Sequence, residues 1–123
     1  MALPKGFAGS FDDQVSSSLD LNQLLVHSPA STYFMRVHGE GLISEGSDDG
    51  DIVIVDRALQ PSDGDLVVAV LGGELSLKQL HINKSARSLS SRSGSEIIPI
   101  NDETDIEFWG VVTASIKQFR SDK

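Results

Sequence analysis

The sequence predicts a single, mainly β domain that follows an extended N-terminal arm. Short apolar runs, rich in β-branched residues, alternate with turn residues at intervals of roughly 8–12 positions, as in all-β domains. The length of 123 residues fits one domain. Residues 1–18 contain Gly, Ser and only scattered apolar positions. We therefore assign residues 1–18 to a mobile arm and residues 19–123 to a core of short, largely antiparallel strands.

The first elements of the core follow from local signals. Residues 20–26 predict a short helical turn, with Asp20 as its N-cap and Pro29 marking its end. Alternating side chains over 33–38 predict a strand with one apolar face. The continuous β-branched run 52–55 predicts a strand that is buried on both faces.

A hairpin is predicted in the middle of the chain. Residues 61–64 have the chemistry of a tight turn, with Pro at position i+1 and Gly closing it. The apolar run 66–71 reads as a strand, and Gly72-Gly73 suits a type I′ turn because both of its central residues need positive φ. The return strand is expected over 74–82.

The last third is predicted as a loop and two strands. Residues 83–95 carry six Ser and read as a mobile loop. Residues 97–100 and 107–119 supply further strands, and we expect the last one to be an edge strand that a second copy could cover. Trp109 is expected to be a core aromatic residue, with an interface anchor as the alternative.

Composition excludes several classes of function. The net charge of −8 and the lack of a basic stripe argue against direct binding to nucleic acid, whose affinity comes mostly from Lys and Arg. No apolar run approaches the roughly 20 residues of a membrane span. Cysteine is absent, which excludes disulfides and thiolate metal sites and fits a cytoplasmic location. His27, His38 and His81 are scattered, so we expect neither a metal nor a cofactor.

Two features offer candidate chemistry. Lys78 lies in the return strand and shares a face with Leu80 and Ile82, so it is expected to be partly buried. Burial disfavours the charged form of a lysine, and only a neutral amine can act as a general base. Gly41 lies in a glycine-rich segment before the buried strand. The alternative for Lys78 is a solvated lysine in a strand. The alternative for the Gly41 segment is an irregular loop.

Four further segments occur in the order of a known pattern: 49–56 (DGDIVIVD), 64–69 (GDLVVA), 73–80 (GELSLKQL) and 107–112 (EFWGVV). Together with Gly41 and Lys78, the set resembles the LexA/UmuD family of Ser-Lys self-cleaving proteins. Segments 20–25 and 27–34 are similar to the opening of the UmuD-like core. The resemblance covers about residues 6–120.

The resemblance implies a mechanism and a defect. In the family a Ser attacks a bond in the protein's own arm and a Lys acts as its base. Lys78 is at the base position, but Gly41 stands where the family has the nucleophilic Ser, so the chain is expected to be cleavage-inactive as written. By register the cleavage bond is Lys5–Gly6, and Ala8–Gly9 is the alternative. Ser44 lies three residues from the nucleophile position and is not expected to substitute.

The resemblance also implies a role in the bacterial SOS response. The RecA–single-stranded-DNA filament would stimulate cleavage, and the processed homodimer would serve as accessory subunit of an error-prone, UmuC-like Y-family DNA polymerase in translesion synthesis. The alternative is the C-terminal dimerisation and autocleavage domain of a LexA-like or phage repressor. A β-module with only a scaffolding role is a third reading.

Overall fold

The computed structural model describes residues 20–38, 50–91, 94 and 96–120. Within these residues the strands form a seven-stranded, entirely antiparallel sheet in the order β1-β2-β7-β3-β4-β5-β6. The elements are helix α1 (Leu21–Leu25), a 3₁₀ turn (Pro29–Ser31), β1 (Thr32–Arg36), β2 (Ile52–Asp56), β3 (Leu66–Leu71), β4 (Glu74–Asn83), β5 (Ala86–Ser90), β6 (Ile97–Ile100) and β7 (Ile106–Ile116). The mainly β fold is confirmed. The assignment of residues 1–18 to an arm lies outside the described residues.

The entry into the sheet follows the predicted local signals. Asp20 caps α1, because its carboxylate accepts a hydrogen bond of 2.9 Å from the backbone N–H of Asn22. Pro29 then opens the 3₁₀ turn that leads into β1. No helix in the described part of the chain is long and apolar enough to cross a membrane.

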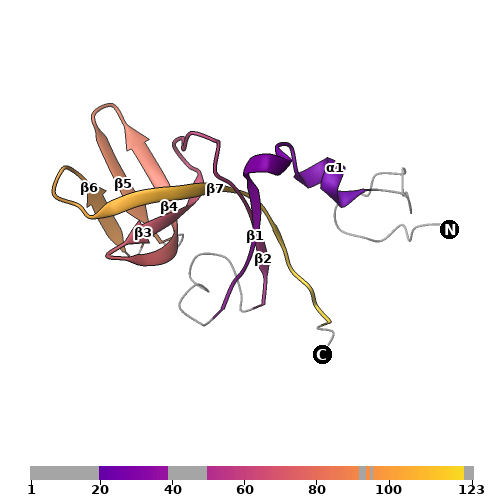
Figure 1. The fold of residues 1–123 in the computed structure, drawn as a ribbon. Helices are drawn as coiled ribbons and strands as arrows, with labels where there is room; N and C mark the ends of the chain where they lie inside the picture. The colour runs from indigo at the N-terminus through magenta and orange to yellow at the C-terminus, as the bar shows by residue number, and fades with distance from the viewer. Residues whose placement is uncertain (1–19, 39–49, 92–93, 95, 121–123) are drawn as a thin grey trace, which may run out of the picture.

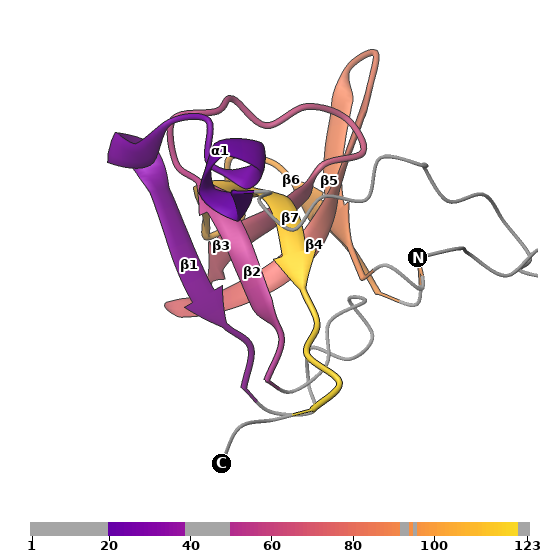
Figure 2. The ribbon, with the colours of Figure 1, turned by 90° about the vertical axis from the view of Figure 1, so that its right-hand side faces the viewer.

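Strand β7 joins the two halves of the molecule. It runs from the part of the sheet that contains β3 to β6 toward β1 and β2 (Figure 1), and Figure 2 shows β1, β2 and β7 side by side. Its first half pairs with β3 and its second half with β2, each with one shift of register. The expectation that the last strand is an edge strand was therefore wrong, since β1 and β6 are the edges. Strand order depends on long-range pairing, which the local pattern does not encode.

The core consists of two clusters on opposite faces of the sheet. Successive strand residues point to opposite faces, so the neighbours Val67 and Val68 of β3 belong to different clusters. The first core cluster contains the buried residues Val37, Val53, Val55, Val68 and Leu77. The second core cluster contains Val67, Ala69, Leu80, Leu89 and Val111.

The turn predictions had mixed outcomes. The Gly72-Gly73 hairpin is confirmed, with φ of 56° and 87°. The tight turn covers residues 62–65, so Asp63 and not Pro61 occupies position i+1: the Asp65 N–H donates to the Ser62 carbonyl, and Gly64, with φ of 89°, occupies position i+2. The predicted loop 83–95 was wrong over Ala86–Ser90, which forms β5 against β4.

Candidate functional site

Lys78 occupies the middle of β4, directly opposite Val67 of β3. Its side chain is 14% exposed, and its face of the strand also carries Leu80, which is fully buried in the second core cluster. Ile82, two residues further along, is 38% exposed. The predicted partial burial of Lys78 is thus confirmed, because the strand alternation places it at the margin of the core.

The Lys78 amine forms an ion pair with a residue that the sequence pattern did not reveal. Its Nζ lies 3.1 Å from Oε1 of Glu96, whose side chain is 59% exposed. The Glu96 N–H donates to Ser91 Oγ at 3.3 Å, and the Ser91 N–H donates to the Glu96 carbonyl at 3.1 Å. These two bonds fix the Glu96 backbone beside the end of β5, so the carboxylate reaches the amine from the solvent side.

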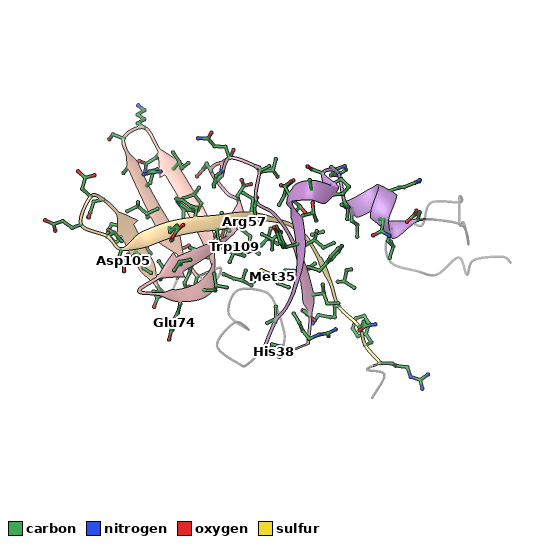
Figure 3. The ribbon with its side chains drawn as sticks, viewed as in Figure 1. Met35, His38, Arg57, Glu74, Asp105 and Trp109 are labelled. Carbon is green, nitrogen blue, oxygen red and sulfur yellow. The ribbon has the colours of Figure 1, made fainter. Side chains whose placement is uncertain are left out.

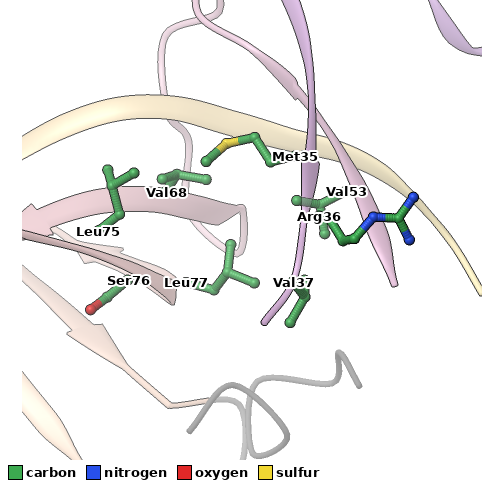
Figure 4. Close-up of a pocket in the computed structure, with 8 residues that line it drawn as sticks. All are labelled: Met35, Arg36, Val37, Val53, Val68, Leu75, Ser76 and Leu77. Carbon is green, nitrogen blue, oxygen red and sulfur yellow. The ribbon is translucent and has the colours of Figure 1, made fainter. Parts of the chain in front are cut away.

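A small apolar cavity of about 60 Å³ opens next to this strand. Figure 4 shows its lining, contributed by β1, β2, β3 and β4. The residues are Met35, Arg36, Val37, Val53, Val68, Leu75, Ser76 and Leu77. Ser76 and Leu77 directly precede Lys78 in β4, so the cavity and the amine belong to adjacent parts of one strand.

The described residues on either side of residues 39–49 are hydrogen-bonded to each other. The Val37 N–H donates to the Asp51 carbonyl and the Gly50 N–H donates to the Val37 carbonyl, each at 2.8 Å. The buried carboxylate of Asp51 forms an ion pair with Lys117, whose Nζ lies 3.2 Å from Oδ2. These contacts hold the start of β2 and the chain beyond β7 together, and Val37 also packs in the first core cluster.

The remaining predicted site residues cannot be placed beside Lys78. Gly41 lies outside the described residues, as do both predicted cleavage bonds, Lys5–Gly6 and Ala8–Gly9. Their assignment as nucleophile position and cleavage sites stays a prediction. The general-base role of Lys78 stays one too.

A second polar cluster lies at the end of β2. The carboxylate of Asp56 accepts hydrogen bonds from the Ala58 N–H at 2.9 Å and from the Ser31 hydroxyl at 2.7 Å. The Ala58 bond first, then the Ser31 bond and the nearby His27, hold the pKa of Asp56 below its usual value, although burial acts in the opposite direction. The cluster ties the 3₁₀ turn to β2.

Trp109 of β7 lies beside Arg57, the residue after β2 (Figure 3), and also contacts Tyr33 of β1. The Arg57 guanidinium lies 4.4 Å from the centre of the Trp109 ring and its Nε donates to the Trp109 carbonyl at 2.9 Å. Tyr33 meets the same ring edge-on, with centroids 5.4 Å apart. Trp109 also packs against the first core cluster, so the prediction of a core aromatic residue is confirmed.

The histidines do not gather into a metal site in the part of the chain that is described. No group of three or more His, Asp or Glu side chains there could hold an ion. His81 instead forms a hydrogen bond with Ser90, with 2.7 Å between Nε2 and Oγ.

Comparison with known proteins identifies the protein family to which this chain belongs. Residues 2–113 match the family described as Peptidase S24-like, and the chain belongs to that family. It is 32% identical to Protein SamA of Salmonella typhimurium, over 96% of this chain and 82% of SamA. It is 34% identical to Protein ImpA of Escherichia coli, over 94% and 79%, and 32% identical to Protein MucA of Escherichia coli, over 90% and 77%.

These relatives define the branch within the family. SamA, ImpA and MucA are UmuD-like proteins, so the predicted resemblance to UmuD is confirmed. LexA repressor 2 of Pseudomonas syringae is 34% identical, but over 70% of this chain and 43% of the repressor. The matches support a UmuD-type role in SOS mutagenesis.

Proposed function

We propose that the chain is a UmuD-type accessory protein that binds an error-prone Y-family DNA polymerase during translesion synthesis, and that its self-cleavage is disabled at Gly41. One observation carries the proposal. A UmuD-like chain keeps a partly buried Lys78 in the strand that supplies the base, while the nucleophile position reads Gly41.

The chemistry explains why this single difference is decisive. In an intact Ser-Lys site the neutral lysine amine takes the hydroxyl proton while the serine oxygen bonds to the scissile carbonyl carbon. The lysine then gives the proton to the leaving amine, and water hydrolyses the acyl intermediate. Gly41 offers no hydroxyl and hence no atom to attack. The lysine alone has no covalent step to assist.

The surroundings of Lys78 support its assignment as base. Its side chain is mostly withdrawn from water. On the same face of β4, two residues further along, Leu80 is fully buried in the second core cluster. A tethered arm would meet such a site at high effective concentration, within one chain or across a dimer.

Restoring the hydroxyl tests the proposal. We expect Gly41→Ser to produce a new fragment at alkaline pH that begins at Gly6, or at Gly9 if the alternative bond is cut, as measured by intact mass. The unchanged chain and the Gly41→Ser, Lys78→Ala double variant should stay whole. Cleavage of the unchanged chain, or equal cleavage with Lys78 replaced, would contradict the assignment. RecA–single-stranded-DNA filament should accelerate the cut.

The proposed partners are proteins rather than DNA. The net charge of −8 disfavours phosphate contacts, so an action at damaged DNA would pass through the polymerase and the RecA filament. We expect the purified chain to co-elute with a Y-family polymerase and to leave the mobility of bare single-stranded DNA unchanged. Retention on bare DNA without the polymerase would argue against this role.

We also propose a homodimer. Three large apolar side chains of α1 and β1 are more than half exposed: Leu21 at 54%, Leu24 at 52% and Phe34 at 57%. β1 is an edge of the sheet, so its outer backbone groups have no neighbouring strand among the described residues. A second copy would cover both the apolar surface and this edge.

The alternative role, the C-terminal domain of a LexA-like repressor, keeps one supporting observation, the 34% identity to LexA repressor 2. The repressor matches a smaller share of this chain than SamA does. Binding to the polymerase distinguishes the two roles, because a repressor domain has no need of it.

A further inference from the structure

Among the described residues, Glu96 is the charged group that contacts the Lys78 amine. On β3 the residue opposite is the apolar Val67. On its own face of β4 the next titratable group is the exposed Glu74, four residues away. His81 points to the other face and contacts Ser90. Asp65, whose carbonyl accepts from the Leu80 N–H, lies diagonally across from Lys78, and its carboxylate accepts from the Ser62 N–H at 2.8 Å. Glu96, at 3.1 Å, is therefore the described carboxylate that pairs with the amine.

Two effects oppose each other at this amine. An opposite charge within about 4–6 Å favours the charged form by about 1–3 pH units, and full burial disfavours it by up to about 3–5 units. Lys78 keeps 14% of its side chain exposed, so it is not fully buried. The ion pair therefore acts against the effect of partial burial on the charged amine.

We propose that Glu96 restrains Lys78 by holding it as an ammonium ion near neutral pH, so that the lysine becomes a base more readily when the Glu96 carboxylate moves away. The inference rests on the proposed role of Lys78 as base. Glu96 is a positioning residue in this scheme, since it acts through the lysine.

The geometry lets the restraint be released without unfolding. The Glu96 backbone is fixed by its two hydrogen bonds with Ser91, whereas the side chain is 59% exposed. A rotation of that side chain toward solvent, or a cationic group of a binding partner, would remove the carboxylate from the amine. The sheet itself would not change.

The first test measures the lysine directly in the otherwise unchanged chain. Glu96→Gln keeps the size and exposed position of the side chain and removes its charge. We expect the Lys78 side-chain amine, followed by NMR, to lose its proton about one pH unit lower in Glu96→Gln, the smaller end of the range because the carboxylate is exposed. Glu103→Gln, an equal charge change in an exposed loop, should leave the midpoint in place, and Glu96→Asp should give an intermediate one. An unchanged or higher midpoint in Glu96→Gln would overturn the restraint.

The second test reads the same effect in chemistry. In the Gly41→Ser background, Glu96→Gln should accelerate cleavage about tenfold near neutral pH, because one pH unit is a tenfold change in neutral amine. The two rates should converge at alkaline pH. Cleavage of Gly41→Ser without acceleration would refute the restraint and leave the proposed function standing. If neither variant is cut at any pH, the proposed Ser-Lys site is wrong, while the NMR midpoint still decides whether Glu96 restrains the lysine.

Discussion

At the scale of single residues, Asp56 shows how one buried carboxylate couples the structure to pH. It is 8% exposed and accepts hydrogen bonds from the Ala58 N–H and the Ser31 hydroxyl. These bonds favour the ionised form, so the pKa of Asp56 is lower in the folded chain than its usual value. The resulting stabilisation is present above the unfolded pKa of about 3.9 and is lost as the pH falls through the folded value.

We therefore expect Asp56→Asn to lower the stability of the fold near neutral pH and to lose this effect in acid. Urea unfolding, followed by the fluorescence of Trp109, would measure it across a pH series. The gap in free energy of unfolding between the unchanged chain and the variant should narrow below about pH 4. Asp102→Asn, a change in an exposed loop, is the control and should give no such gap. A gap of constant size at every pH would mean that the charge of Asp56 contributes nothing.

Residue patterns predicted the lysine but not its partner. Alternation along β4 places Lys78 beside Leu80, and its partial burial follows from that alone. Glu96 lies beyond a Ser-rich segment and reaches Lys78 only because β5 folds back along β4. A contact of this kind depends on pairing between distant segments, so no motif in the sequence predicted it.

At the scale of elements, β5 was missed for a physical reason. Only Leu89 of its five residues is a large apolar side chain, and the Ser residues around it resemble a loop. Pairing on both sides, with β4 and β6, supplies the stabilisation that its own composition lacks. β2, by contrast, was predicted from a run of four β-branched residues that is buried on both faces.

Gly110 is a glycine within β7, and the structure shows why a larger residue would not fit there. A Cβ at this position would lie 2.5 Å from Cγ1 of Val55, a fully buried side chain of β2. We expect Gly110→Ala to destabilise the fold by about 1–3 kcal/mol, the usual cost of overpacking a core. Thermal and urea unfolding would measure the loss.

A second substitution separates the clash from a backbone effect. Val55→Ala removes Cγ1, so the added cost of Gly110→Ala should shrink in that background, as two residues in direct contact are not additive. Equal costs in both backgrounds would show that the Val55 contact is not the cause.

At the scale of the whole molecule, the sequence predicted the fold class and most strands but not the order of the strands. Turn chemistry and strand periodicity are local, and they located the β3–β4 hairpin. The position of β7 between β2 and β3 comes from its length, because one half pairs with each neighbour. This arrangement leaves β1 and β6 as edges, and the two edges differ. β6 is short and contains Pro99, which lacks a donor for pairing.

The difference between the edges makes the dimer testable. β1 lies beside the exposed apolar residues of α1 and offers a pairing edge without a proline. We expect the chain to sediment as a dimer at micromolar concentration, and Leu24→Glu or Phe34→Glu to make it a monomer, because a buried unpaired charge would oppose contact. Ile97→Glu places the same charge at a more exposed apolar residue of β6, where Ile97 is 67% exposed, and should stay dimeric.

The outcome also bears on the proposed cleavage chemistry. If the unchanged chain sediments as a monomer, the dimer proposal fails and any cut restored by Gly41→Ser must occur within one chain. If it is dimeric and only the α1 and β1 variants dissociate, mixing two inactive partners becomes informative. Gly41→Ser, Lys78→Ala would then be mixed with a chain whose Lys5–Gly6 and Ala8–Gly9 bonds are intact and whose Lys78 is unchanged. The first chain has the serine without the lysine, and the second has the lysine without the serine. If the dyad forms within a single chain, neither chain should be cut. This holds whether the arm that is cut comes from the same subunit or from its neighbour.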